Sequence, residues 1–374
     1  MTCKYMRIME NNLAEVIDAS ISASSENSSY LATNAINRFR SKQWHATGRF
    51  TIDSTNTNIY TSDGNTTIST GEYTTPAALA TEIQTQLNAI GSNWTCTYDS
   101  SGGTYKFTIA NSASKTLTIS TSTNAIWDTI GFTGSTDQTG TTFLADEQRN
   151  HTSETVTFDL GYAGTVRFFA AIGTLDEVFS ISSDATVKLQ GNNLDLWTAP
   201  PFEKTLTRYD SGIYQFLESE TYADTNYRYW RFYIEDKKNP LGSDGCVKVS
   251  HIYIGDYVSL TDRNIASGFA KSVVDPSIRS ESENGAIYFD TRTKYTVFTS
   301  MGYGYVDKDD RATLEQVYDR IGTTAPIYIS LDPGLGISNT LDDLTKYVIY
   351  DSAPVMNHVV YDKFNYALSF REVV

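Results

Sequence analysis

Hydrophobic and polar positions alternate along much of this chain of 374 residues, which is the pattern of half-buried strands. The segment Val156-Thr-Phe-Asp-Leu-Gly161 shows the alternation most clearly. Four further strong runs predict strands at 165–172, 185–190, 227–235 and 247–254. Ser, Thr, Tyr, Val and Ile fill these runs, and such residues suit a pleated surface. The pattern therefore predicts a mainly β protein.

A helical pattern interrupts the strands at 76–90. Thr75 is a candidate N-cap and Pro76 stands in the first turn. One apolar stripe follows, formed by Leu79, Ile83, Leu87 and Ile90. Predicted strands at 94–98 and 105–109 flank the turn signal Ser100-Ser-Gly-Gly. Residues 49–148 are thus expected to form a small α+β domain.

A third pattern begins near residue 286, after a connector rich in Ser, Asn and Asp. Strands are predicted at 287–289 and 295–300, before a helix at 309–321 with Asp307 or Asp309 as its cap and Gly322 at its end. Further strands are predicted at 327–331, 346–351 and 364–373. We expect residues 257–374 to form a β-rich assembly domain with one helix.

The net charge and the apolar content limit the kinds of partner that the chain is expected to bind. The formal net charge is −15, and no basic patch offers a contact to phosphates, so nucleic acid is not an expected partner. No run of about 18 apolar residues is present, which argues against membrane insertion. Residues 1–12 lack the apolar core of a secretory signal. We therefore expect synthesis in the cytoplasm.

Several motifs occur in one order along the chain: Ala35-Ile-Asn-Arg with Gln43-Trp44, Val156 to Gly161, Val187 to Trp197, Tyr227-Arg-Tyr-Trp-Arg-Phe-Tyr233, and Val249 to Gly255. This order resembles the discoidin, or coagulation factor 5/8 type C, family. The resemblance implies a jelly-roll β-sandwich made of residues 1–48 and 149–256. Its expected core contains the bulky residues Trp44, Phe158, Leu160, Trp197, Trp230 and Phe232.

The chain departs from the discoidin pattern in three places. About 110 residues separate Trp44 from the Asp-Leu-Gly strand, where the family has a short stretch, so residues 49–148 are interpreted as an insertion into one loop. Asn37 stands where the family usually has Gly, and Gly191-Asn-Asn-Leu-Asp replaces its Ser-x-Asp-Gly. The ligand-binding loops of the family are therefore not carried over.

Segments in two other parts of the chain are similar to proteins of tailed-bacteriophage virions. In the insertion they are Gly71-Glu-Tyr-Thr-Thr-Pro-Ala-Ala-Leu-Ala and Ile130-Gly-Phe-Thr. In the C-terminal domain, Ile327-Tyr-Ile-Ser-Leu-Asp-Pro333 and Ala367-Leu-Ser-Phe-Arg-Glu-Val373 resemble the ends of distal-tail and tail-tip proteins. The resemblance implies a structural protein of the tail tip or baseplate, assembled in the host cytoplasm. Its expected partners are other virion proteins and, in a ring, identical copies.

Candidate chemistry is sparse. The four histidines are scattered, and Cys3, Cys96 and Cys246 form neither a CxxC pair nor a disulfide framework, so we expect free thiols, no metal and no cofactor. No Gly-x-Ser-x-Gly turn is present for a nucleophile. Acidic residues at 307–310 are expected to begin a helix, and Asp342-Asp343 to do the same or lie solvated. We predict no catalytic residue and no enzymatic activity, although a surface hydrolase with paired carboxylates remains a minor alternative.

The tyrosines near residue 227 admit two interpretations. They are either core and rim of the sandwich, or part of a surface that stacks on sugars or partner proteins. For the second case the candidate contacts are Tyr222, Tyr227, Asn192 and Asn193. We expect a structural virion protein first. The alternatives are a carbohydrate-binding module that contacts a host-surface glycan, and a decoration protein of the phage head or neck.

Overall fold

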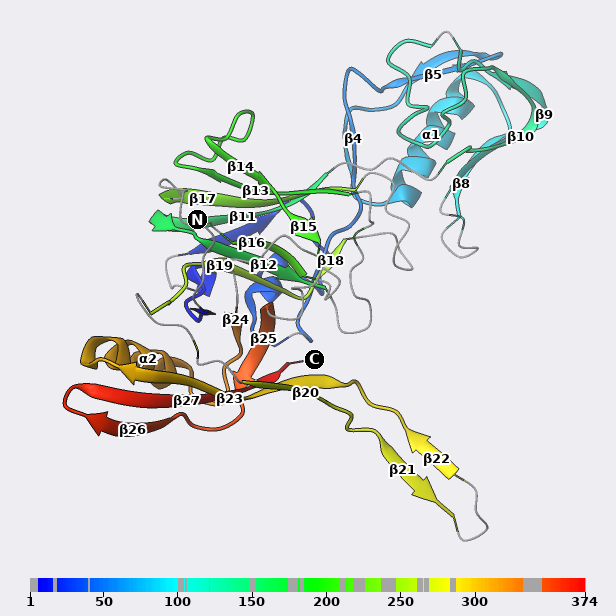
Figure 1. Ribbon diagram of the computed structural model, residues 1–374. Helices are drawn as coiled ribbons and strands as arrows, with labels where there is room; N and C mark the ends of the chain where they lie inside the picture. The colour runs from blue at the N-terminus through cyan, green and yellow to red at the C-terminus, as the bar shows by residue number, and fades with distance from the viewer. Residues whose placement is uncertain are drawn as a thin grey trace.

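The structure of this protein, a computed structural model, confirms a mainly β fold. It describes residues 6–15, 19–39, 41–99, 104, 106–120, 122–147, 153–173, 181, 185–208, 213–217, 226–236, 247–260, 265, 269–282, 287–331 and 345–373. A β-sandwich occupies the middle, with an α+β unit on one side of it and a long C-terminal sheet on the other (Figure 1).

The sandwich consists of two facing antiparallel sheets. One has the order β14 (Phe202–Thr205), β13 (Thr186–Asn192), β17 (Asn226–Glu235), β11 (Glu154–Thr165) and β2 (Ser20–Ala23). The other has the order β15 (Thr207–Arg208), β16 (Ile213–Leu217), β12 (Phe168–Ile172) and β19 (His251–Gly255). A short pair, β3 (Trp44–His45) with β18 (Lys248–Val249), and the turns η1 (Leu13–Glu15) and η2 (Ala32–Ile36) close one end.

The core of the sandwich follows from strand alternation. Along β17, Trp230, Phe232 and Ile234 point inward and are fully buried. Trp44, Phe158 and Leu160 are fully buried in the same cluster. Trp197 was expected there, but the structure places it outside. Trp197 lies half-buried in the exposed loop that follows β13. Its ring packs against Arg231 on the outer face of the sheet.

The inserted unit has its own core, whose buried members come from residues 50–145. Its main sheet has the order β10 (Gln138–Leu144), β9 (Phe107–Leu117), β5 (Asn58–Thr61) and β6 (Gly64–Thr67), with β8 (Trp94–Tyr98) also paired to β9. A second pair joins β4 (Phe50–Ile52) to β7 (Gly71–Tyr73). The predicted helix is confirmed as α1 (Pro76–Ile90), and Thr75 caps it by accepting from the backbone N–H of Ala78 at 3.2 Å.

The C-terminal sheet has the order β1 (Arg7–Met9), β24 (Ile327–Ser330), β25 (Thr345–Tyr350), β27 (Lys363–Glu372), β23 (Tyr295–Val306) and β20 (Ala270–Val274). β26 (Val355–Val360) pairs with β27. The predicted helix is confirmed as α2 (Lys308–Ile321), capped by Asp307, and packs Leu314, Val317 and Ile321 into the core. Beyond β20 and β23 the chain continues as a separate hairpin, β21 (Ile278–Glu281) with β22 (Ile287–Asp290).

The first strand differs from the prediction that residues 1–48 belong to the jelly roll. β1 pairs with β24 of the C-terminal sheet, and Met6 and Ile8 lie in its core. Only a few residues later, Leu13 lies in the core of the sandwich. The hydrophobic pattern of so short a strand contains no information on which sheet it joins.

An aromatic layer joins the sandwich to the C-terminal sheet. Phe168 from β12 lies 5.6 Å from Tyr328 of β24, measured between ring centroids. His251 of β19 stacks on Tyr347 of β25 at 5.1 Å. Together with Tyr253 these side chains are almost fully buried in one cluster, so the two sheets share a core and form a continuous unit.

The inserted unit meets the sandwich at a narrow neck that contains a buried carboxylate. Glu154, at the start of β11, accepts hydrogen bonds from the hydroxyls of Ser24 at 2.5 Å and Ser25 at 2.8 Å. The Nε atom of Arg49 lies 3.9 Å away, and Arg49 also pairs with Glu72 of the insertion. Burial raises the pKa of Glu154, although the hydroxyls and Arg49 oppose the shift.

The variant Glu154→Gln is expected to be less sensitive to pH than the parent. Because the folded pKa is raised above the ordinary value of 4.5, the folded protein keeps a proton that the unfolded chain has already lost. Stability is therefore highest below that value and falls as the pH rises through the folded pKa. Gln carries no charge and still accepts both hydroxyl hydrogen bonds.

Thermal unfolding at a series of pH values measures this effect. The midpoint of the parent should fall relative to that of Glu154→Gln as the pH rises above the ordinary value of 4.5. Glu281→Gln, an exposed position on the β21–β22 hairpin, is the control that should track the parent. A constant difference between parent and Glu154→Gln at every pH would contradict the assignment.

Candidate functional site

Three of the four predicted contact residues, Asn192, Asn193 and Tyr227, lie at one end of the five-stranded sheet, and each of them contacts other parts of the sandwich. Asn192 binds its own loop, donating to the carbonyl of Leu196 at 2.6 Å and accepting from the N–H of Leu194 at 3.2 Å. Asn193 accepts from the backbone N–H of Arg228 at 3.3 Å. These two side chains shape the loop after β13. Tyr222, the fourth candidate, lies outside the described residues.

Tyr227 lies half-buried beside the sandwich core. Its ring contacts Trp230 edge-on, with 5.6 Å between centroids, and lies 6.3 Å from Phe202. Gly191 permits this packing, because a Cβ there would lie 2.8 Å from the Tyr227 ring. Its position therefore agrees with the interpretation of this tyrosine as part of the core and rim.

A group of side chains that the sequence interpretation missed lies on the outer face of the same sheet. We call Lys188, Gln190, Trp197, Glu203 and Arg231 the outer-face platform. The Arg231 guanidinium lies over the Trp197 ring at 4.5 Å. It also donates to the side-chain amide oxygen (Oε1) of Gln190 at 2.7 Å. Gln190 in turn donates to Glu203 at 2.6 Å, and Lys188 pairs with Glu203 at 2.8 Å. The outward positions of β13 and β17 would have identified most of this set.

The electrostatics of the platform keep its side chains in place. Hydrogen bonds from Lys188 and Gln190 lower the pKa of Glu203, and the bond to Glu203 raises the pKa of Lys188. Burial under Trp197 and its neighbours lowers the pKa of Arg231. The result is an ordered set of planar groups, flanked by the exposed Leu194 and Leu196, that suits a polar ligand with flat faces.

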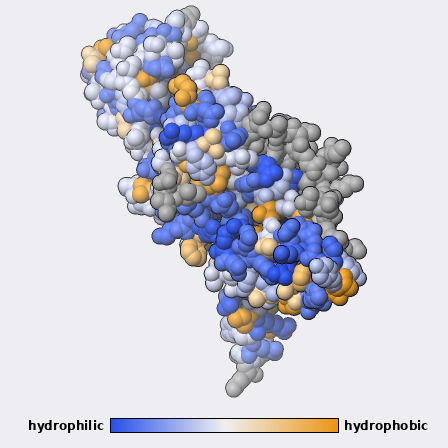
Figure 2. All heavy atoms as spheres, turned by 90° about the vertical axis from the view of Figure 1, so that its left-hand side faces the viewer, coloured by the Kyte–Doolittle hydropathy of each residue, from blue (hydrophilic) through white to orange (hydrophobic). Residues whose placement is uncertain are grey.

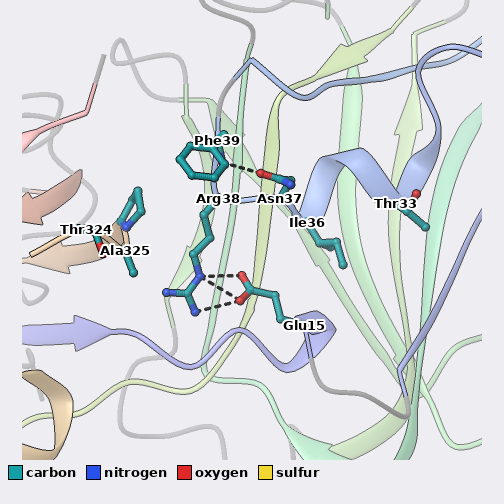
Figure 3. A pocket seen from close by; sticks show the side chains of 9 residues that line it. Glu15, Thr33, Ile36, Asn37, Arg38, Phe39, Thr324 and Ala325 are labelled. Atoms are coloured by element: carbon teal, nitrogen blue, oxygen red, sulfur yellow. Dashed lines mark hydrogen bonds and ion pairs between the residues drawn. The ribbon is translucent and has the colours of Figure 1, made fainter. Parts of the chain in front are cut away.

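A cleft of about 560 Å³ lies where the loop after η2 faces residues 324–326 of the C-terminal domain (Figure 3). Arg38 pairs with both carboxylate oxygens of Glu15, at 2.9 and 3.1 Å. Burial alone would lower the pKa of Arg38, but its bond to Glu15 outweighs burial and raises it. The charges of Arg38 and Glu15 neutralise each other. The rest of the lining is mainly apolar, and the exposed Phe39 lies at the edge of the cleft.

Two hairpins of the C-terminal sheet expose apolar side chains. On β21–β22, hereafter the arm, every residue is exposed, and Phe289 reaches 70% exposure. On β26 all six residues are exposed, and Tyr361 in the following turn reaches 95%. Seen from the side toward which the β26–β27 hairpin points, hydrophobic residues lie in several separate spots among hydrophilic ones on the surface (Figure 2).

The described residues contain no group of three His, Cys, Asp or Glu side chains placed to hold a metal. His45 stacks on Tyr30, His251 lies in the aromatic layer and His358 lies beside Phe364, while His151 falls outside the description. Asp307 caps α2. Cys96 is buried, which raises the pKa of its thiol to about 12 and makes it unreactive. Cys3, Cys246, Asp342 and Asp343 lie outside the described residues.

Among the described helices, none has the length and the apolar composition needed to cross a bilayer.

Comparisons with known proteins leave the family open. No family model matches the chain, and no curated protein matches it. One solved structure, described as CpGH89CBM32-6 produced by Clostridium perfringens, is similar over 65% of this chain and 98% of its own. The TM-score is 0.27 and the sequence identity 10%, so no conclusion is drawn from this likeness. The phage resemblance of the sequence receives no support from these comparisons.

The two tryptophans of the sandwich are expected to differ strongly in their contribution to stability. Trp230→Ala removes a fully buried ring and should lower the free energy of unfolding by about 3–5 kcal/mol. Trp197→Ala removes a half-buried ring that contacts Arg231 and donates an exposed hydrogen bond to Asp195 at 2.6 Å, and should cost about 1 kcal/mol. Denaturant unfolding of the full chain distinguishes them. Equal losses in the free energy of unfolding would indicate that Trp197 is a core residue and would contradict the structure.

Proposed function

We propose that this chain is a non-enzymatic structural subunit of a larger protein assembly, and that its C-terminal domain makes the assembly contacts. The observation that carries the proposal is the arm. Its two strands pair only with each other among the described strands, and it exposes Ile278, Ile287, Tyr288 and Phe289. A domain that functioned alone in water would gain nothing from such an extension.

Elementary energetics favour a covered arm. An isolated two-stranded hairpin is marginally stable in water, because it has no third strand or helix to pack on. Burying one large apolar side chain stabilises by about 1.5–3 kcal/mol. Covering the four partly exposed large side chains of the arm would therefore contribute to the stability of an interface with a partner surface.

The proposed setting is the virion of a tailed phage, at the tail tip or baseplate. The support comes from the phage-like segments of the insertion and of the C-terminal domain, and from the arrangement of the domains. The C-terminal sheet and the inserted unit lie on opposite sides of the sandwich (Figure 1). A subunit held by its C-terminal domain would thus project the sandwich and the insertion outward.

The test uses particles produced from a genome that encodes this chain. We expect mass spectrometry to find the chain in purified particles at a fixed copy number. Phe289→Asp should strongly reduce its incorporation, because a charge replaces an apolar contact. Leu194→Asp is the matched control: this leucine is 62% exposed, on the sandwich rather than the arm, and its replacement should leave incorporation unchanged. Particles that lack the chain would end the proposal.

A second candidate function, binding of a host-surface glycan, is favoured by the outer-face platform. The half-buried Trp197 ring and the exposed Glu203 carboxylate are groups of the kind that a sugar ring contacts, and the buried Gln190 holds Arg231 and Glu203 in place behind them. On a glycan array, the full chain should bind a restricted set of sugars, and Trp197→Ala should lose them while Leu144→Ala, on the insertion, keeps them. Absence of binding at high protein concentration, or equal binding by both variants, would leave the structural role alone.

A further inference from the structure

The neck between the sandwich and the insertion is held by polar bonds. At the first crossing of the chain, Ala46 lies in the core of the sandwich and Phe50 in the core of the insertion, so only residues 47–49 separate the two cores. None of the hydrophobic clusters formed by the described residues has members in both units. The orientation of the insertion on its narrow connection (Figure 1) therefore depends on a small number of polar contacts.

Arg49 makes three of these contacts. One nitrogen of its guanidinium pairs with Glu72 on β7 of the insertion, and another donates to the backbone carbonyl of Ser153 at 3.4 Å, where the chain crosses back. The third, Nε, lies 3.9 Å from the Glu154 carboxylate of the sandwich. The Thr51 hydroxyl donates to Glu72 at 3.0 Å and so fixes that carboxylate on the insertion. Arg49, Glu72 and Glu154, hereafter the neck clamp, thus link a carboxylate of each unit through one guanidinium.

A hinge position lies directly beside the neck clamp. Gly48 has a φ of 67°, in the left-handed region that residues with a side chain rarely adopt. The preceding residue, Thr47, is tied to the sandwich because its backbone N–H donates to the Ser25 hydroxyl at 3.1 Å. Hinges consist of a few such residues, which take up the change in backbone angles. Rotation about Gly48 would turn the insertion while both cores stay intact.

The sandwich half of the neck clamp is poorly suited to a permanent charge. Glu154 is only 1% exposed, and its Oε1 atom has no hydrogen-bond partner among the described residues. The same holds for Nε of Arg49 and Oγ1 of Thr47. A buried carboxylate with incomplete hydrogen bonding favours its neutral form. Burial accordingly raises the pKa of Glu154 above 4.5, although two serine hydroxyls and Arg49 oppose the shift.

Other titratable and charged groups lie on the segments that surround Glu154. They are Glu26, His45, Glu72, Glu235, Asp236 and Lys248. Histidines commonly titrate near neutral pH, so His45 is the alternative source of a response to acid. Its ring stacks on Tyr30, and its Nε2 lies 2.7 Å from the Gln43 side chain. Arg49, in contrast, forms an ion pair with Glu154 itself, so a proton on Glu154 acts directly on the neck clamp.

We propose that the neck is a proton-operated hinge. When Glu154 is charged, Arg49 is attracted to both units and the neck clamp holds the insertion in the described direction. When Glu154 takes up a proton, Arg49 keeps Glu72 but loses its attraction to the sandwich, and the insertion turns more freely about Gly48. The inference concerns the single chain and goes beyond the proposed assembly role. It also gives a reason for a buried carboxyl group at a place where glutamine would avoid the cost of a buried charge.

Single-molecule energy transfer in the full chain tests the hinge. In a background with Cys3→Ser and Cys246→Ser, the dyes are attached through Leu144→Cys on the insertion and Leu194→Cys on the sandwich, both exposed positions. Cys96 stays in place because it is buried. We expect a narrow distribution of transfer efficiencies at neutral pH. It should become at least about twofold broader as the pH falls through the folded pKa of Glu154, because the insertion then samples more orientations.

Variants assign the response to one group. Glu154→Gln should give the broad distribution at both pH values, because Gln offers Arg49 no charge. Glu281→Gln on the arm and His45→Gln should keep the pH response of the parent. The inference is overturned if the parent is equally narrow at both pH values, if Glu154→Gln stays narrow at neutral pH, or if His45→Gln abolishes the response. Loss of the near-ultraviolet circular dichroism at the acidic pH would mean unfolding in place of hinge motion, and would overturn it as well.

Discussion

The arrangement of the whole molecule depends on the aromatic layer between the sandwich and the C-terminal sheet. Phe168 and Tyr253 from one sheet meet Tyr328 and Tyr347 from the other, and His251 stacks among them. Rings of this size bury large apolar areas, and their tilted packing at 4.7 to 5.6 Å favours one relative orientation. The two halves are therefore held in a fixed direction, which no flexible connector would achieve.

The N-terminal segment strengthens the same joint. β1 is a strand of the C-terminal sheet, yet Asn12 donates to the carbonyl of Ile252 and accepts from the N–H of Ile254 in the sandwich. Gly255 has no side chain at the point where this segment crosses, and a Cβ there would lie 2.4 Å from the carbonyl oxygen of Asn11. One short stretch thus ties both sheets together. The direction of the arm relative to the sandwich follows from this joint.

The sequence correctly predicted those strands and helices whose hydrophobic residues repeat with a regular period. The alternation at 227–235 gave β17 with Trp230 and Phe232 inward, and the stripe at 76–90 gave α1 with its Thr75 cap. The prediction that Trp197 lies in the core was wrong. The discoidin resemblance gave only the place of Trp197 in the order of motifs, whereas the path of the loop after β13 determines whether its side chain is buried. β1 was misassigned for a related reason: three residues have no period of their own, and only tertiary pairing with β24 chooses their sheet. The outer-face platform was missed because its members come from different strands and a loop, and only the fold brings them together.

The central claim is that the arm is solvent-exposed in the single chain and covered in the assembly. Hydrogen–deuterium exchange, followed by mass spectrometry on dissociated and assembled protein, tests it most directly. The account predicts that amides of residues 278–281 and 287–290 exchange at least about tenfold more slowly after assembly, while amides of the insertion sheet stay unchanged. Equal exchange of the arm in both states would contradict it.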